Sequence, residues 1–310
     1  MLVKIQKQRI RKGMFIESVA CPSREFARRR FMLASDKDLA AILATSATEV
    51  SINIALGLDE NGAQSRAGSQ AAPQAEPQRA QAVRGELDQV TVALKANLRE
   101  IVDAGTLDMA GLSRAAEHNA RTWSDSAVIA LEVTRLKTKD ETTYVHSLAV
   151  SGMMTLLARA LELDDETTGL LGVAGMLHDI GKLLIPNEIL TKPGALTDAE
   201  REIIRNHPEA GYQLLKTYPE IPQVALDICR LHHEVLDGSG YPLGLKQKDL
   251  SATVRLSTVC DVFEALTSVR PYKRPWTSTE ALDWMFARPH LFDRKMVIRL
   301  GSVLVDAPIV

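Results

Sequence analysis

The chain has 310 residues, of which 45% are apolar and 25% charged, with a formal net charge of -2. These values are typical of a globular protein with one large or two modest domains and ample chain to bury a core. A net charge this close to zero gives no global indication of binding to a nucleic acid polymer or to an acidic membrane.

Simple sequence patterns argue against several further classes of protein. The basic start, residues 1–13, is not followed by the apolar stretch of ~7–15 residues that a signal peptide requires. No apolar run approaches the ~20 residues needed to span a bilayer. Three widely separated cysteines (Cys21, Cys229 and Cys260) predict neither a disulfide framework nor a cysteine zinc site. We therefore expect a cytoplasmic protein with no membrane span.

Residues 1–57 are expected to form a small α/β regulatory domain. Ser35 and Asp38 have the spacing of a helix start, and residues 49–56 alternate apolar and polar side chains as a strand does. Ten Lys/Arg against five Asp/Glu give this segment a net charge of +5, which leaves -7 for the rest of the chain. Opposite charges of this size suggest an electrostatic docking surface that salt would weaken, with basic residues that are merely solvated as an equally open alternative.

The composition changes after this segment. Residues 58–84 are rich in Ala, Gln, Pro, Gly and Ser and have almost no large apolar residues, which predicts a flexible linker. Residues 85–310 repeat apolar residues at helical spacing, as at 87–101 and 148–161, and lack convincing strand alternation. The expected fold class is therefore mainly all-α, with one helical domain at 85–310.

Histidines are concentrated in the helical part. Five of the seven fall between residues 146 and 233, namely His146, His178, His207, His232 and His233. Asp179 follows one of them, and Asp261 lies further along. A single histidine on an apolar face is more often a hydrogen-bonded core residue, but imidazole and carboxylate groups together suit divalent Fe, Mn, Zn or Ni. Burying the whole set without a metal would cost about 1–3 kcal/mol per unsatisfied group.

The adjacent pair His178 and Asp179 favours a site with two metal ions. Neighbouring residues on a helix point about 100° apart, so the pair cannot chelate one ion from the same face. A carboxylate has two oxygens and can bridge two ions while its neighbour binds one of them. The pair His232 and His233 allows the same arrangement.

The order of these residues resembles the HD phosphohydrolase superfamily, and further motifs are similar to the HD-GYP subfamily. These motifs are HDIGK at 178–182, NHPEAG at 206–211, HHEVLDGSGYP at 232–242 and RPYK at 270–273. The similarity covers about residues 140–290. The basic N-terminal segment resembles the small domain of unknown function often found before HD-GYP domains.

The resemblance implies an HD-type helical bundle whose binuclear metal site hydrolyses cyclic di-GMP, a bacterial second messenger, to pGpG and often on to GMP. One metal would be held by His146, His178, Asp179 and Asp261, and the other by Asp179 as a bridge with His207, His232 and His233. Two divalent transition-metal ions are implied, with Fe or Mn expected first and Ni or Zn also compatible. Thr142 stands where some family members carry a glutamate for a third metal, which favours two ions.

The resemblance also implies residues that act on the substrate. Asp179 and Lys182 are the expected catalytic residues, with Lys182 touching the phosphate or protonating the leaving oxygen. Arg270 and Lys273 lie in a stretch with loop character. We expect them to clamp the second phosphate and the guanine side of the ligand, with a solvated loop equally open.

The loop at residues 237–242 carries Tyr241, which we expect to stack on a base or to serve partner contacts, with a packing role equally open. Diguanylate cyclase (GGDEF) domains are an implied partner through this loop. Glu234 is expected to orient an imidazole by a hydrogen bond.

Two alternatives to this function remain. One is a catalytically weak cyclic dinucleotide sensor or scaffold that signals through residues 1–57 or through partner proteins. The other is a hydrolase of a related compound, either a mixed GMP-AMP cyclic dinucleotide or a nucleotide monophosphate.

Overall fold

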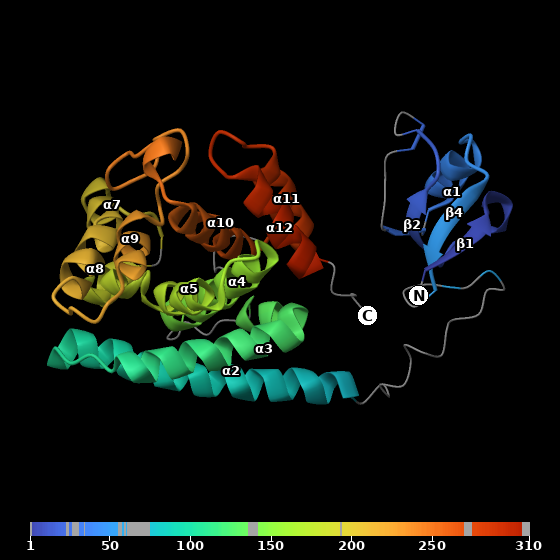
Figure 1. Ribbon diagram of the computed structural model, residues 1–310. Helices are drawn as coiled ribbons and strands as arrows, with labels where there is room; N and C mark the ends of the chain where they lie inside the picture. The colour runs from blue at the N-terminus through green and yellow to red at the C-terminus, as the bar shows by residue number, and fades with distance from the viewer. Residues whose placement is uncertain are drawn as a thin grey trace. The chain divides into compact units, whose positions relative to one another are not determined.

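The computed structural model describes residues 2–22, 25–26, 31–33, 35–54, 58, 60, 75–135, 142–192, 194–269 and 275–305. The chain divides into two compact units, residues 1–78 and residues 79–310, and the division falls in the first turn of a long helix (Figure 1). Across the described residues, no helix combines the length and apolar character that crossing a bilayer requires.

The N-terminal unit is built around a small antiparallel sheet with the strand order β1-β4-β2-β3. Val3 pairs with Ile52 and Ile5 with Val50, which aligns the buried face of β1 with that of β4. The described elements are β1 (Leu2–Gln6), η1 (Lys7–Arg9), β2 (Phe15–Val19), β3 (Phe31–Met32), α1 (Asp36–Leu43) and β4 (Glu49–Asn53).

The sequence patterns of this unit are realised in the structure. Helix α1 begins where predicted, because the Ser35 hydroxyl accepts a hydrogen bond from the backbone N–H of Asp38 at 3.0 Å. The predicted strand at 49–56 is β4, and its alternating residues Val50 and Ile52 are fully buried together with Ile42 of α1. The expected small α/β domain is confirmed.

The second unit is helical, which confirms the expected fold class. The one β-type pairing among its described residues is an isolated bridge between Asp237 and Lys246. Its elements are α2 (Ala75–Arg99), the π-helical turn η2 (Glu100–Ala104), α3 (Met109–Arg135), α4 (Thr142–Ala160), α5 (Asp165–Leu177), η4 (Ile180–Leu184), α6 (Asn187–Leu190), α7 (Asp198–Arg205), α8 (His207–Leu215), α9 (Gln223–Leu231), η5 (Gln247–Asp249), α10 (Ala252–Thr267), α11 (Ser278–Phe286) and α12 (Arg294–Val305).

Helices α2 and α3 lie side by side and form a layer beneath α4 and α5 (Figure 1). The Thr122 hydroxyl of α3 donates a hydrogen bond to the Glu86 carboxylate of α2 at 2.9 Å. Arg79 of α2 donates another to the carbonyl oxygen of Asp125 at 2.7 Å. Trp123 of α3 is fully buried in the main hydrophobic core, to which α4 and α5 also contribute.

The predicted linker at residues 58–84 requires a correction, because α2 already begins at Ala75. Ala, Glu, Gln and Arg are good helix formers, so a shortage of large apolar residues does not prevent a helix here. Val83, on the part of α2 within this stretch, is 6% exposed and belongs to the main core. Residues 61–74 of the predicted linker lie outside the described residues.

Two glycines allow the elements of the predicted site to approach closely. Gly175 of α5 lies against Ser151 of α4, where a Cβ atom would collide with the backbone. Gly181 of η4 lies against the backbone of His207, where a Cβ atom would collide with the carbonyl oxygen. The first approach brings the end of α5 to α4, and the second brings η4 to the start of α8.

Candidate metal centre

The structure brings the seven predicted ligands together. They are His146 of α4, His178 at the end of α5, Asp179 before η4, His207 at the start of α8, His232 and His233 after α9, and Asp261 of α10. All are buried except His233, whose side chain is 22% exposed. Their possible ligand atoms form two groups that share Asp179, one with His146 and His178 and the other with His207, His232 and His233.

The first group is centred on His146. Its Nε2 atom lies 3.2 Å from Asp179 Oδ2 and 3.1 Å from Asp261 Oδ1. His178 Nε2 lies 3.6 Å from the same Asp179 oxygen. The other oxygen of Asp261 lies 3.5 Å from His233 Nδ1, so the Asp261 carboxylate faces both groups.

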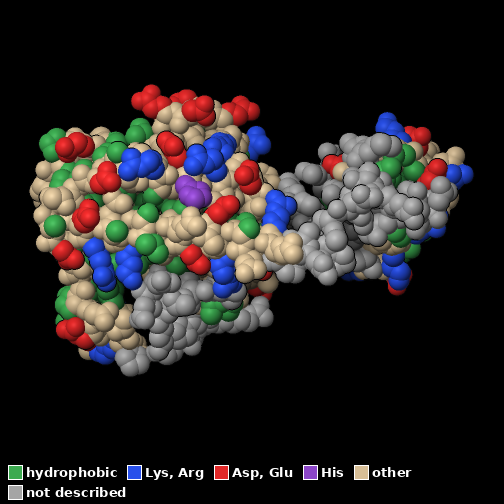
Figure 2. Space-filling view, turned by 90° about the horizontal axis from the view of Figure 1, so that it is seen from below, with side chains coloured by type: hydrophobic (Ala, Val, Ile, Leu, Met, Phe, Trp, Pro, Cys, Tyr) green, Lys and Arg blue, Asp and Glu red, His purple; other side chains and the backbone are tan. Residues whose placement is uncertain are grey.

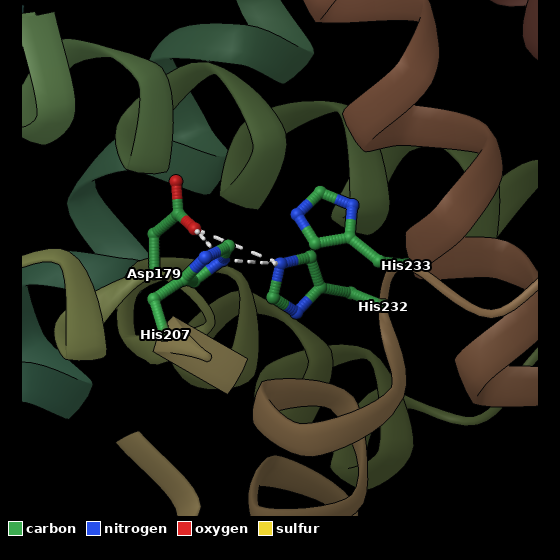
Figure 3. A group of neighbouring side chains, drawn as sticks. All are labelled: Asp179, His207, His232 and His233. Atoms are coloured by element: carbon green, nitrogen blue, oxygen red, sulfur yellow. Dashed lines mark hydrogen bonds and ion pairs between the residues drawn. The ribbon is translucent and has the colours of Figure 1, made fainter. Parts of the chain in front are cut away.

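The second group is drawn in Figure 3, where the Asp179 carboxylate points toward His207 and His232. Asp179 Oδ1 lies 3.1 Å from His207 Nε2 and 3.6 Å from His232 Nε2, and these two nitrogens are 3.3 Å apart. Asp179 Oδ1 is nevertheless a buried atom for which the described residues supply no hydrogen bond of acceptable geometry. A buried carboxylate oxygen in this state requires another partner.

Backbone carbonyls determine which nitrogen of three imidazoles is free. A carbonyl oxygen only accepts hydrogen bonds, so a ring nitrogen bonded to it must carry the proton. The Nδ1 atoms donate in this way from His178 to Gly175 at 2.7 Å, from His207 to Ile204 at 2.7 Å and from His232 to Cys229 at 3.0 Å. In the neutral form of each ring, the Nε2 lone pair is then directed into the cluster.

His146 has a different partner, which the sequence analysis did not assign. Its Nδ1 atom lies 2.7 Å from Glu264 Oε2, and the Ser268 hydroxyl donates to the other oxygen of Glu264 at 2.5 Å. Glu264 is 2% exposed and lies one turn after Asp261 on α10. That one-turn spacing was the available signal, because it places both carboxylates on the same helical face.

The electrostatics of the cluster favour neutral imidazoles beside ionised carboxylates. Burial lowers the pKa of His178 to about 3, and burial also lowers the pKa of His207. Burial opposes ionisation of Asp179, but Lys182 and the surrounding histidines hold its pKa well below the usual range. These are the protonation states that metal binding requires.

His146 is the exception. Burial alone would lower its pKa, but Glu264 first, and then Asp179 and Asp261, raise the pKa of His146 to about 10. Glu264 lies at Nδ1 of this ring and the two aspartates lie at Nε2, so carboxylates on both sides favour positive charge at this position.

The residues present fit a divalent metal. The cluster combines an orphaned buried carboxylate oxygen with imidazole nitrogens whose free lone pairs face one another, and a cation among them would satisfy both. Imidazole and carboxylate groups are the donor set that divalent transition metals accept. Asp179 belongs to both groups of donors, as a bridging carboxylate must.

The expected substrate residues differ in where they lie. Lys182 Nζ is 2.5 Å from Asp179 Oδ2, and its side chain is 24% exposed. Tyr241 stacks on His233, with ring centroids 4.6 Å apart and an interplanar angle of 27°. Arg270 and Lys273 lie outside the described residues, so their role as a clamp stays a prediction.

The expected role of Glu234 is wrong. Its carboxylate is 1% exposed and accepts hydrogen bonds from the backbone N–H groups of Leu243, Gly244 and Leu245 at 2.6–3.0 Å. The carboxylate therefore holds the loop that follows Tyr241 instead of orienting an imidazole. Three consecutive backbone N–H groups of the loop converge on this carboxylate, so adjacency to His233 in sequence does not decide its partner.

Comparison with known proteins agrees with this arrangement. The family model of the HD domain matches residues 124–296, and that of a domain of unknown function, DUF3391, matches residues 2–126. Cyclic di-GMP phosphodiesterase PA4108 of Pseudomonas aeruginosa is 36% identical over 297 residues, which are 91% of this chain and 72% of that protein. The 3'3'-cGAMP-specific phosphodiesterase 2 of Vibrio cholerae is 35% identical over 164 residues, 52% of this chain and 31% of that protein.

A solved structure supports the fold over nearly the whole length. Bd1817, described as an HDG"Y"P protein from Bdellovibrio bacteriovorus, superposes with a TM-score of 0.59 at 17% identity, covering 98% of this chain and 100% of that one. The HD domain match spans more than half of the chain and includes all seven residues of the cluster. The chain therefore belongs to the HD domain family and carries the domain of unknown function DUF3391 ahead of its HD domain.

Proposed function

We propose that this chain is a metal-dependent phosphodiesterase that hydrolyses cyclic di-GMP to linear pGpG and onward to GMP. The observation that carries the proposal is the convergence of four imidazole Nε2 atoms on the buried Asp179 carboxylate, those of His146, His178, His207 and His232. The relative from Pseudomonas aeruginosa, which matches most of the chain, is named for this activity.

Asp179 is the bridging ligand in this proposal, with His146, His178 and Asp261 on one side and His207, His232 and His233 on the other. Two divalent ions bound there would supply Lewis acidity at the phosphate and lower the pKa of an attacking water. Fe or Mn is the expected metal, with Ni or Zn also compatible with these donors.

Lys182 balances the charge of Asp179 in the described structure, at 2.5 Å from Oδ2. With divalent ions held by Asp179, the Lys182 ammonium group would be available to meet the substrate phosphate or to protonate the leaving oxygen. Lys182 is 24% exposed and can therefore reach a ligand without unfolding η4.

Tyr241 is proposed to line the substrate site, because its ring stacks directly on the predicted ligand His233. Arg270 and Lys273 complete the proposed site as a clamp for the second phosphate. Contact of the loop at residues 237–242 with GGDEF domains, and a cytoplasmic location, also stay proposals.

A second substrate is favoured by one observation: the relative from Vibrio cholerae is named as specific for 3'3'-cGAMP. Cyclic di-GMP and the mixed GMP-AMP compound share the same two phosphodiesters, so the metal cluster alone does not discriminate between them. Discrimination would depend on residues that contact the bases.

The decisive experiment incubates purified, metal-loaded protein with each cyclic dinucleotide and separates the products by chromatography. The proposal expects pGpG and then GMP from cyclic di-GMP, faster than product from the mixed compound. Asp179→Ala is the matched inactive control. Fully loaded protein that binds cyclic di-GMP without forming product would instead indicate a sensor or scaffold.

A further inference from the structure

A column of stacked groups leads from the metal cluster to the surface. The Tyr241 ring stacks on His233, and the Arg205 guanidinium carbon lies 4.5 Å from the centroid of the Tyr241 ring. Arg205 is the last residue of α7, and His207 of the cluster begins α8 two positions later. The Tyr241 ring thus separates the guanidinium group from the predicted metal ligand His233.

The hydrogen-bonding capacity of this guanidinium is unused within the described part of the chain. Its side chain makes no hydrogen bond or ion pair there, although it is exposed and carries five N–H donors. Two other arginines of this unit differ: Arg201, one turn earlier on α7, pairs with Asp198 at 2.5 Å, and Arg230 of α9 pairs with Glu209 at 2.7 Å. Arg205 is therefore positioned by an aromatic ring while its donors stay free.

We propose that Arg205 is a substrate-recognition residue that binds an anionic group of the substrate beyond the phosphodiester being hydrolysed. The proposal rests on the proposed function, because a cyclic dinucleotide has one such group, its second phosphate. The planar fork of an arginine matches two phosphate oxygens, and contact with an aromatic face reduces the freedom that the side chain loses on binding. Tyr241 then acts as the support for Arg205 and not solely as a platform for a base.

A purely structural role for Arg205 predicts a different outcome. If Arg205 only held Tyr241 in place, its loss would disturb His233 and the cluster, and every phosphodiester would be affected equally. If Arg205 binds a second anionic group, its loss should leave the hydrolysis rate of a substrate with a single phosphodiester unchanged. Bis(4-nitrophenyl) phosphate is such a substrate.

The test compares wild-type, Arg205→Ala and Arg205→Lys proteins in their metal-loaded, full-length form, with Arg201→Ala as the matched control on the same helix. Direct binding of cyclic di-GMP and hydrolysis of bis(4-nitrophenyl) phosphate are both measured. Arg205→Ala should weaken cyclic di-GMP binding roughly 10- to 100-fold, the loss expected for a charged hydrogen bond. Arg205→Lys should weaken it less, and Arg201→Ala should not change it.

Hydrolysis of bis(4-nitrophenyl) phosphate should be the same in all four proteins. The inference would be overturned if Arg205→Ala weakened cyclic di-GMP binding and bis(4-nitrophenyl) phosphate hydrolysis equally, or if it changed neither. Both results would leave the proposed function intact. Failure of the wild-type protein to bind cyclic di-GMP at all would overturn the proposed function and the inference with it.

Discussion

Replacing Glu264 by glutamine tests how the cluster is held in position. Glu264 is 2% exposed, lies 2.7 Å from His146 Nδ1 and makes the largest favourable charge contribution to the raised pKa of that imidazole. Glutamine keeps the shape and one accepting oxygen but removes the charge. A hydrogen bond to a charged group contributes about 1.5–3 kcal/mol, which corresponds to roughly 10- to 100-fold in metal affinity.

The assay is competition for metal between the protein and a chelator of known affinity, combined with thermal unfolding. Glu264→Gln should bind at least one of its ions more weakly. Glu234→Gln is the matched control, because Glu234 is equally buried but accepts only from the backbone of residues 243–245. It should lower thermal stability more than metal affinity. Unchanged metal affinity in Glu264→Gln would refute the reasoning.

Three further predictions concern the metals and the helical unit. Asp179→Ala should lose both ions, because Asp179 belongs to both groups of donors, and full metal content by elemental analysis would disprove the bridge. The pKa of His146, raised from 6.5 to about 10, means that its proton stabilises the metal-free fold below pH 6.5 and that this stability is lost as the pH rises through about 10. Metal uptake at about pH 8 should therefore release a proton from His146, which calorimetry in buffers of different ionisation enthalpy would detect. Metal uptake without proton release would show that the raised pKa of His146 is wrong. A chain of residues 86–310 should unfold more easily in urea than one of residues 75–310, by about 1.5–3 kcal/mol, because it lacks buried Val83; equal stability would contradict the place of α2 in the core.

The sequence alone predicted the residues of the cluster, because their types and order match a long motif. It also predicted the fold class, because apolar residues at helical spacing dominate the second unit. Local patterns of this kind depend on neighbours within a few positions. Ser35 is an example, since its cap needs only the backbone N–H of Asp38.

The contacts that hold the cluster were not predictable in the same way. His146 and Glu264 are 118 positions apart, so their hydrogen bond depends on how α4 packs against α10. Glu234 was misassigned because its sequence neighbour is a predicted ligand, whereas its carboxylate is taken by a loop nine to eleven positions later. Arg205 lies in none of the sequence motifs, and its position over Tyr241 depends on how the loop at residues 237–242 folds.

The role of the N-terminal unit also stays a prediction. The face of the helical unit on the side of α2 and α3 carries basic and acidic side chains interspersed (Figure 2). A surface of mixed sign gives a weak long-range field. Charge-driven docking of residues 1–57, which carry a net charge of +5, stays a prediction, and such docking would weaken with salt.

The most direct test of the central claim follows metal content and cyclic di-GMP hydrolysis in the same titration. Metal-free protein receives increasing Mn or Fe, and each sample is analysed for bound metal per chain and for the rate of pGpG formation. The account predicts little hydrolysis at one ion per chain and a rise to the maximal rate as the second ion is bound. Maximal hydrolysis at one ion per chain, or no hydrolysis at two, would contradict it.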